Sequence, residues 1–185
     1  KKLSKLVWRG DIGTNGHKSE SSEFKNRVEL VRKSFGDSSD KLDAKFLVTK
    51  ERLESKADPK NFPREGLTAE PVSEDDTRDY LTNILSHRYI IATEDDYRIN
   101  SDLKWMFLSQ SVVLMPEEHR FSSWFMEDFF EPYVHYVPIA SDYSDVEEKL
   151  KWCEENIKDA ETISERATLF VHDMLFHYSS DRENS

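Results

Sequence analysis

Three short apolar runs between residues 88 and 139 constrain the fold more than any other feature of this sequence. They are Tyr89–Ala92, Val112–Met115 and Val134–Ile139, and two segments of helical length separate them. Apolar runs of four to six residues without polar alternation are typical of strands buried on both faces. Strands that alternate with helices are typical of a parallel sheet. The sequence therefore predicts an α/β fold, a Rossmann-like parallel sheet with helices on both faces.

A strand and a helix of the same kind are predicted before this core. The first ten residues, KKLSKLVWRG, predict a strand that ends at Arg9-Gly10, and a polar loop with two glycines follows. Ser22 is a candidate N-cap of the next helix, and Gly36 stands where a C-terminal cap belongs. We expect the loop to offer backbone N–H groups to an anion, although an Arg-Gly pair after a strand is more often a plain turn.

The remaining segments complete the predicted order. Residues 41–50 predict a short strand, and residues 51–76, which are polar and rich in proline, predict a mobile insertion loop. Ser73 opens a helix over residues 77–86, and Ser144 with Glu147 forms a capping box before another helix. A last helix is predicted over residues 156–178, with Ala160, Ile163, Ala167, Phe170 and Met174 on its buried side. We expect one α/β domain over residues 1–178 and a frayed tail at 179–185.

Charge and cysteine content exclude several classes of protein. A net charge of -11 argues against nucleic acid or an anionic membrane surface as partner, since both attract clustered lysine and arginine. The single cysteine, Cys153, rules out an intrachain disulfide and a zinc finger, and its apolar neighbours predict a buried thiol. We expect no membrane span and find no signal-peptide pattern, which leaves the cytoplasm and the secretory lumen open.

The loop that follows the strand at Tyr89–Ala92 is the first candidate site, because ligands of parallel sheets bind at the carboxyl ends of strands. Asn100 or Ser101 can cap the next helix, and Arg98 and Lys104 are the nearby cations, an arrangement that favours a phosphate. Three carboxylates at 94–96 repel a bare anion, and they favour sugar hydroxyls or a metal instead. A solvated acidic loop is the third interpretation.

Few other residues offer a site. Glu127 lies in an aromatic-rich predicted helix, where its carboxylate is suited to a ribose diol, or else it is an exposed helix residue. His119 and His135 lack a second ligand at metal spacing, and His135 is expected to pack in a strand. No catalytic triad or metal motif is found, so the catalytic residues stay unknown and no metal site is predicted.

Several segments in this order resemble glycosyltransferase family 90, which includes protein O-glucosyl- and O-xylosyltransferases, the fungal capsule-associated xylosyltransferase and bacterial lipopolysaccharide-modifying enzymes. The similarity covers most of residues 6–170, and residues 104–145 are its most specific part. The segments are WRGDIGTNG, RYIIAT, LKWMFLSQSVVLM and WFMEDFFEPYVHYVPIASDYSD.

The resemblance implies the C-terminal, nucleotide-binding half of a GT-B enzyme, which is inverting, independent of metal and uses a UDP-sugar. It implies that Arg9 contacts the donor diphosphate and that the loop at Asp95–Ser101 and Lys104 add contacts. Gly10, Thr14 and Arg27 belong to the same candidate donor set. The family's catalytic base comes from an N-terminal half that this sequence lacks. Family members from animals have an arginine where this chain has Asp102.

The sequence thus predicts a donor-binding domain that transfers a sugar to a hydroxyl of a glycan, lipopolysaccharide or protein, without a cofactor. One alternative is a metal-dependent, GT-A-like transferase in which Asp95 and Asp96 hold the cation. The other is a non-catalytic nucleotide-sugar-binding or regulatory domain.

Overall fold

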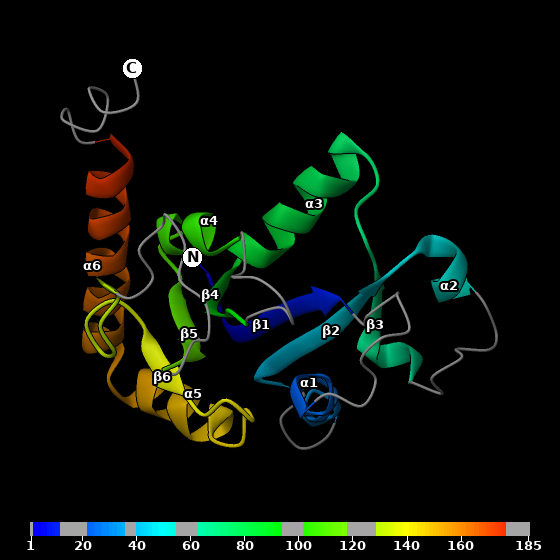
Figure 1. The fold of residues 1–185 in the computed structure, drawn as a ribbon, viewed down its shortest axis with the longest axis horizontal. Coiled ribbons are helices and arrows are strands. Elements are labelled where there is room, and N and C mark those ends of the chain that lie inside the picture. The colour runs from blue at the N-terminus through cyan, green and yellow to red at the C-terminus, as the bar shows by residue number, and fades with distance from the viewer. Residues whose placement is uncertain are drawn as a thin grey trace. The chain divides into compact units, whose positions relative to one another are not determined.

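The computed structural model describes residues 2–11, 22–35, 40–54, 63–93, 102–117 and 129–176. The chain divides into an N-terminal unit, residues 1–87, and a C-terminal unit, residues 88–185. Figure 1 shows the elements that each unit contains. The prediction of one domain over residues 1–178 stays a prediction.

The N-terminal unit is built on three parallel strands. Strand β1 (Leu3–Asp11) pairs with β2 (Leu42–Val48), and β2 pairs with β3 (Leu67–Ala69), in the order β3-β2-β1. Helices α1 (Ser22–Lys33) and α3 (Glu74–Leu85) lie on different sides of these strands (Figure 1), and the short helix α2 (Lys50–Glu54) packs against β3. The predicted strands over residues 1–10 and 41–50 are confirmed.

The two faces of this small sheet differ in chemistry. Buried and half-buried residues alternate along β2, as expected when side chains of one strand point to opposite faces. On the apolar face Trp8 packs edge-to-face on Phe46, with 5.4 Å between the ring centroids. Phe24 of α1 also stacks on Phe46. Arg9 and Asp43 lie on the opposite face, with Lys45 beside Arg9 in the register. Helix α1 therefore covers the apolar face, and the polar face lies on the side of α3.

The segment 51–76, predicted as a mobile insertion loop, contains regular structure in its described part. Helix α2 enters it, the 3-10 turn η1 (Arg64–Gly66) follows, and β3 joins the sheet by pairing Phe46 with Leu67. Of the three residues of β3 only Leu67 is buried, so no apolar run marked the strand. The pairing of β3 with β2, and not local propensity, determines the conformation of this segment.

The predicted helix opened by Ser73 is confirmed as α3, and the Ser73 Oγ accepts a hydrogen bond from Asp76 N at 3.1 Å.

The C-terminal unit also contains three parallel strands, in the order β4-β5-β6. They are β4 (His87–Ile91, which begins at the boundary), β5 (Val112–Pro116) and β6 (Val137–Ile139). The apolar residues of all three are buried, as the uninterrupted runs predicted. Together with the N-terminal unit this confirms the fold class: α/β and Rossmann-like, with every described strand pairing inside each unit parallel.

Helices α4 (Leu103–Leu108), α5 (Val146–Glu155) and α6 (Ile157–Phe176) complete the C-terminal unit. Helix α6 packs on α4 and β5, and α5 packs on β6. Two hydroxyls of α6 reach backbone carbonyls near α4: Ser164 Oγ donates to Ser111 O at 3.1 Å, and Thr168 Oγ1 donates to Phe107 O at 2.7 Å. Ala160, Ile163 and Ala167 are buried as predicted, whereas Val171 is buried where Phe170 was expected.

Residues 131–136 form a tight turn, not the start of the strand predicted at Val134. Tyr133 has a left-handed backbone, with φ 58°, and its N–H donates to Tyr136 O at 2.7 Å. His135 packs against Phe130 and Phe170, and burial lowers the pKa of His135. The packed histidine is therefore confirmed, but it stands in the turn.

Two predicted helix caps are wrong. Helix α4 has Asp102 in the N-cap position in place of Asn100 or Ser101, and the Asp102 side chain makes no cap bond. Helix α5 has Asp145 there in place of Ser144, and the Asp145 Oδ1 accepts a hydrogen bond from Ala140 N at 2.8 Å. The carboxylate of Asp145 thus pairs with a backbone N–H five residues earlier in the chain. Of the caps predicted for α1, Ser22 is the first residue of the helix and not the residue before it. Gly36 lies outside the described residues.

Cys153 is fully buried on α5, and burial raises the pKa of its thiol to about 12. Since the thiolate is the reactive form, we expect no reaction with a disulfide reagent at mildly alkaline pH while the chain is folded. One thiol should react in concentrated guanidinium chloride, which serves as the control. Rapid labelling of the folded chain would contradict the buried position.

Candidate functional site

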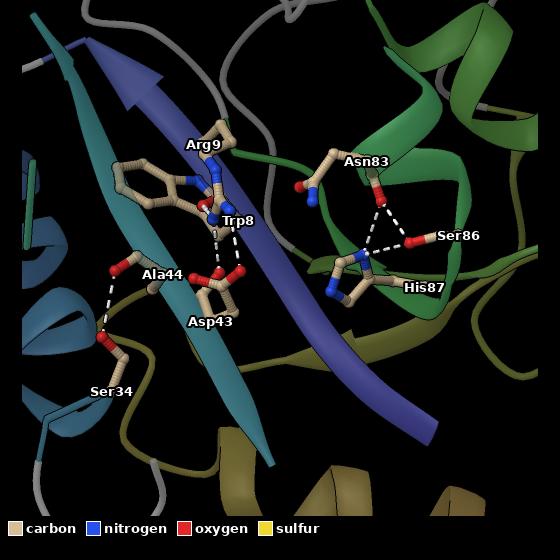
Figure 2. Close-up of polar contacts among 8 residues, drawn as sticks. All are labelled: Trp8, Arg9, Ser34, Asp43, Ala44, Asn83, Ser86 and His87. Carbon is tan, nitrogen blue, oxygen red and sulfur yellow. Dashed lines mark hydrogen bonds and ion pairs between the residues drawn. The ribbon is translucent and has the colours of Figure 1, made fainter. Parts of the chain in front are cut away.

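Arg9 stands inside β1 and is held by its neighbours on the polar face (Figure 2). Its Nη2 donates to Asp43 Oδ2 at 2.7 Å, and its Nη1 donates to Asp43 O at 2.7 Å and to Trp8 O at 2.8 Å. The side chain of Arg9 is 7% exposed and that of Asp43 is 22% exposed. Burial alone would raise the pKa of Asp43, but the hydrogen bond and charge of Arg9 outweigh it and keep the pKa below its usual value. The pair joins β1 to β2.

This geometry limits what Arg9 can offer to a ligand. A guanidinium has five N–H donors, and three of those of Arg9 already point at protein oxygens. Among the described residues, one donor on Nη2 and the Nε–H make no hydrogen bond, and little exposed surface surrounds them. A bidentate contact with a diphosphate, the role implied by the family resemblance, would have to use these two donors, on a side chain that is only 7% exposed.

A cavity of about 350 Å³ opens on the same face, between the sheet and α3. Three of its charged side chains are cations and four are carboxylates, so the set carries a net charge of -1. Two of the cations are paired within the cavity, Arg9 with Asp43 and Lys50 with Asp76 at 3.1 Å. Such a lining does not favour a highly charged anion. The charged residues are Arg9, Lys45, Lys50, Asp43, Glu70, Asp76 and Asp79.

His87 is a second buried polar residue near this face that the sequence did not reveal. Its Nδ1 lies 2.8 Å from Asn83 O, an atom that only accepts, so Nδ1 carries the proton and donates (Figure 2). Ser86 Oγ donates to the same carbonyl at 2.6 Å. These two side chains satisfy a carbonyl at the end of α3, where helix carbonyls lack a helical partner. The arrangement is structural.

The other candidate residues are spread over both units. Gly10 follows Arg9 in β1, and Arg27 is buried on α1, the helix on the opposite face from Arg9. Lys104 is half-buried in the first turn of α4 in the C-terminal unit. Thr14, Arg98, Ser101 and Glu127 lie outside the described residues, as do Asp95 and Asp96. Among the described residues of the N-terminal unit, Arg9 and Gly10 are neighbours in β1 and Arg27 lies on the other face, while Lys104 belongs to the C-terminal unit.

Sequence reasoning missed Asp43, the partner of Arg9. The available signal was a carboxylate in the middle of the apolar strand segment KLDAKFLV, since a charge in a buried strand needs a partner. Within the described ranges no group of three or more histidine, cysteine or carboxylate side chains is placed to hold a metal ion. No helix in the described part of the chain is both long and apolar enough to cross a membrane.

Parallel strands alternating with helices define an α/β protein of the Rossmann-like class, in which ligands bind where the strands end. The chain belongs to glycosyl transferase family 90, whose model matches residues 2–179. The family resemblance predicted from the sequence is thereby confirmed.

Relatives in other organisms match parts of the chain. "O-glucosyltransferase LpsA" of Dichelobacter nodosus is 36% identical over 83 residues, which are 45% of this chain and 26% of that protein. "Protein O-glucosyltransferase 3" of Homo sapiens is 33% identical over 86 residues, 43% of this chain and 17% of that protein. "Uncharacterized protein 179R" of Invertebrate iridescent virus 6 is 25% identical over 95% of this chain and 16% of that protein. The chain thus covers about a quarter or less of each of these relatives.

Proposed function

We propose that this chain is the donor-binding part of a glycosyltransferase that moves a sugar, with inversion, from a UDP-linked donor to a hydroxyl acceptor. The observation that carries the proposal is the family match over residues 2–179. The names of two relatives support a glucosyl group and an oxygen acceptor, so UDP-glucose is the first donor to test. The acceptor hydroxyl belongs to a glycan, a lipopolysaccharide or a protein.

In this proposal the cations around the start of α4 neutralise the donor diphosphate. Lys104 occupies the first turn of α4, and Arg98 and Ser101 precede the helix in sequence. Positive charge there would stabilise the negative charge that develops on the leaving UDP, which is the usual largest contribution in such a transfer. Arg9 is bound to Asp43 in the N-terminal unit, so we assign the first diphosphate contacts to Lys104 and its neighbours. The base that deprotonates the acceptor is left unassigned.

Calorimetry with UDP and UDP-glucose tests this proposal. We expect binding that is unchanged by a chelator, and an affinity about tenfold weaker for Lys104→Met, since a hydrogen bond to a charged group is lost. Lys151→Met is the matched control, because Lys151 is an exposed lysine on α5 of the same unit. It should bind UDP as the wild type does.

Three outcomes would contradict the proposal in different ways. An affinity that collapses on chelation would support the metal-dependent alternative with Asp95 and Asp96. Equal affinities for Lys104→Met and Lys151→Met would remove Lys104 from the donor site. No binding of either nucleotide would remove the donor-binding role itself.

A further inference from the structure

A cavity of about 450 Å³ lies within the C-terminal unit, where β5 and β6 end. Glu117 directly follows β5, and Ile139 is the last residue of β6. The carboxyl ends of parallel strands are the usual ligand edge of an α/β sheet, and the volume falls in the range of about 300–1,000 Å³ typical of small-molecule sites. The lining residues are Glu117, Tyr133, Pro138, Ile139, Ala140, Ser141, Asp145 and Lys149.

Tyr133 presents an aromatic ring at this cavity from a strained backbone. Its φ of 58° is rare for a bulky residue and persists only where the surroundings enforce it, a situation that is frequent at functional sites. The turn at 131–136 enforces it here through the bond from Tyr133 N to Tyr136 O. Trp152 packs against the ring at 5.2 Å, yet Tyr133 keeps 41% of its surface exposed. A large aromatic side chain is thus held rigidly and left partly uncovered.

The polar groups of the cavity are oriented by each other. Lys149 Nζ donates to the Tyr133 hydroxyl at 2.9 Å and lies 4.0 Å from Asp145 Oδ2. The hydrogen bond to Tyr133 raises the pKa of Lys149, so the ammonium is charged at neutral pH. Asp145 is fixed by the bond that its Oδ1 accepts from Ala140 N. Glu117 is exposed at the rim.

The charges of these groups select the kind of ligand. Two carboxylates and one ammonium give the lining a net charge of -1, which disfavours a phosphate. Carboxylate oxygens accept hydrogen bonds and an ammonium donates them, so the cavity suits a molecule rich in hydroxyl groups. The face of an aromatic ring is negative and attracts the polarised C–H bonds on the flat side of such a molecule.

We propose that this cavity binds an uncharged sugar ring, with the ring against Tyr133 and its hydroxyls on Glu117, Asp145 and Lys149. None of these residues belongs to the diphosphate contacts proposed above, so this inference can fail separately from the proposed function. The sugar ring comes from one of two sources, a glycan or the ribose of a nucleotide, and both offer the same chemistry to the cavity.

Two-dimensional NMR of the labelled full chain, titrated with methyl glucoside, methyl xyloside and methyl ribofuranoside, tests the proposal. We expect saturable shift changes at the amides of Tyr133, Ser141 and Lys149 and at the indole of Trp152. Shifts with the pyranosides alone identify a glycan as the source, and shifts with the ribofuranoside identify the nucleotide. UDP serves as a separate titrant, because it reports on the donor site even when the cavity takes no sugar.

Two substitutions of Tyr133 distinguish the contribution of its aromatic ring to sugar binding from that of its hydroxyl. Tyr133→Gly should weaken sugar binding about tenfold, since the stacking surface is lost while glycine accepts the backbone conformation. Tyr133→Phe, which keeps the ring, and Leu169→Ala, on the exposed side of α6, should bind nearly as the wild type does. The absence of shifts with all three glycosides, or unchanged sugar affinity in Tyr133→Gly, would overturn the proposal. UDP binding that persists in that case would leave the proposed function intact.

Discussion

Replacing Asp43 by alanine is expected to lower the free energy of unfolding by about 3 kcal/mol, the lower end of the range for removing one member of a buried ion pair. The guanidinium of Arg9 would stay buried and lose its only carboxylate partner among the described residues. The partial exposure of Asp43, at 22%, is the reason to expect the lower end. Denaturant unfolding followed by circular dichroism measures the change.

The matched control is Glu29→Ala. Glu29 also pairs with an arginine at 2.7 Å, but both side chains are about 60% exposed, and such pairs contribute little. We expect a change within about 0.5 kcal/mol for this variant. Equal effects of Asp43→Ala and Glu29→Ala would show that the Arg9–Asp43 pair is solvated and does not hold β1 to β2.

The loss of stability in Asp43→Ala should also depend on pH, and it should become smaller in acid. The pKa of Asp43 in the folded chain lies below its ordinary value of 3.8, so its contribution to stability is fully present above pH 3.8. It is lost as the pH falls through the folded-state pKa, because the carboxyl is then protonated in both states. The difference in the free energy of unfolding between wild type and Asp43→Ala should therefore begin to shrink below pH 3.8 and be smallest below the folded-state pKa of Asp43.

Replacing Gly10 by alanine is expected to destabilise the chain by about 1–3 kcal/mol, the range for overpacking a buried site. A Cβ on Gly10 would lie 2.3 Å from the Trp8 ring atom Cζ2 and 2.7 Å from Cη2. Trp8 is 1% exposed and packs on Phe46, so its indole has little room to move aside. Gly10 was predicted as a donor contact, and its place in β1 supplies a packing reason for glycine there.

A double-mutant cycle with Trp8→Leu identifies the cause. Without the indole the added methyl meets no ring, and alanine is favoured over glycine in a strand by about 0.5–1 kcal/mol. Gly10→Ala should therefore be neutral or stabilising in the Trp8→Leu background, a coupling that thermal and denaturant unfolding can measure. An unchanged cost in that background would mean that the clash with Trp8 is not the reason for glycine.

The strands that the sequence predicted are those whose cause is local. Val112–Met115 and Tyr89–Ala92 are uninterrupted apolar runs, and such runs leave few alternatives to a strand buried on both faces. Helix α3 was predicted for a similar reason, since Ser73 satisfies the free N–H of Asp76 three residues ahead. In both cases the determining contacts lie within a few residues of each other.

The features that were missed depend on distant partners. Strand β3 exists because it pairs with β2, and Asp43 meets Arg9 across 34 positions of sequence. The same holds for the candidate site. The sequence identified Arg9 as a candidate, but its pairing with Asp43 depends on how β1 and β2 pack.

The two hydrogen bonds from hydroxyls of α6 constrain the amino-acid type of the donor residues but not that of the acceptor residues. Ser164 and Thr168 donate to the carbonyls of Ser111 and Phe107, atoms that every amino acid possesses. The acceptor at position 111 therefore does not depend on the chemistry of its side chain, whereas at 164 and 168 only small hydroxyl residues can supply the donor. A family that varies the segment between α4 and β5 can thus keep the same anchor, provided that the length of the segment is conserved.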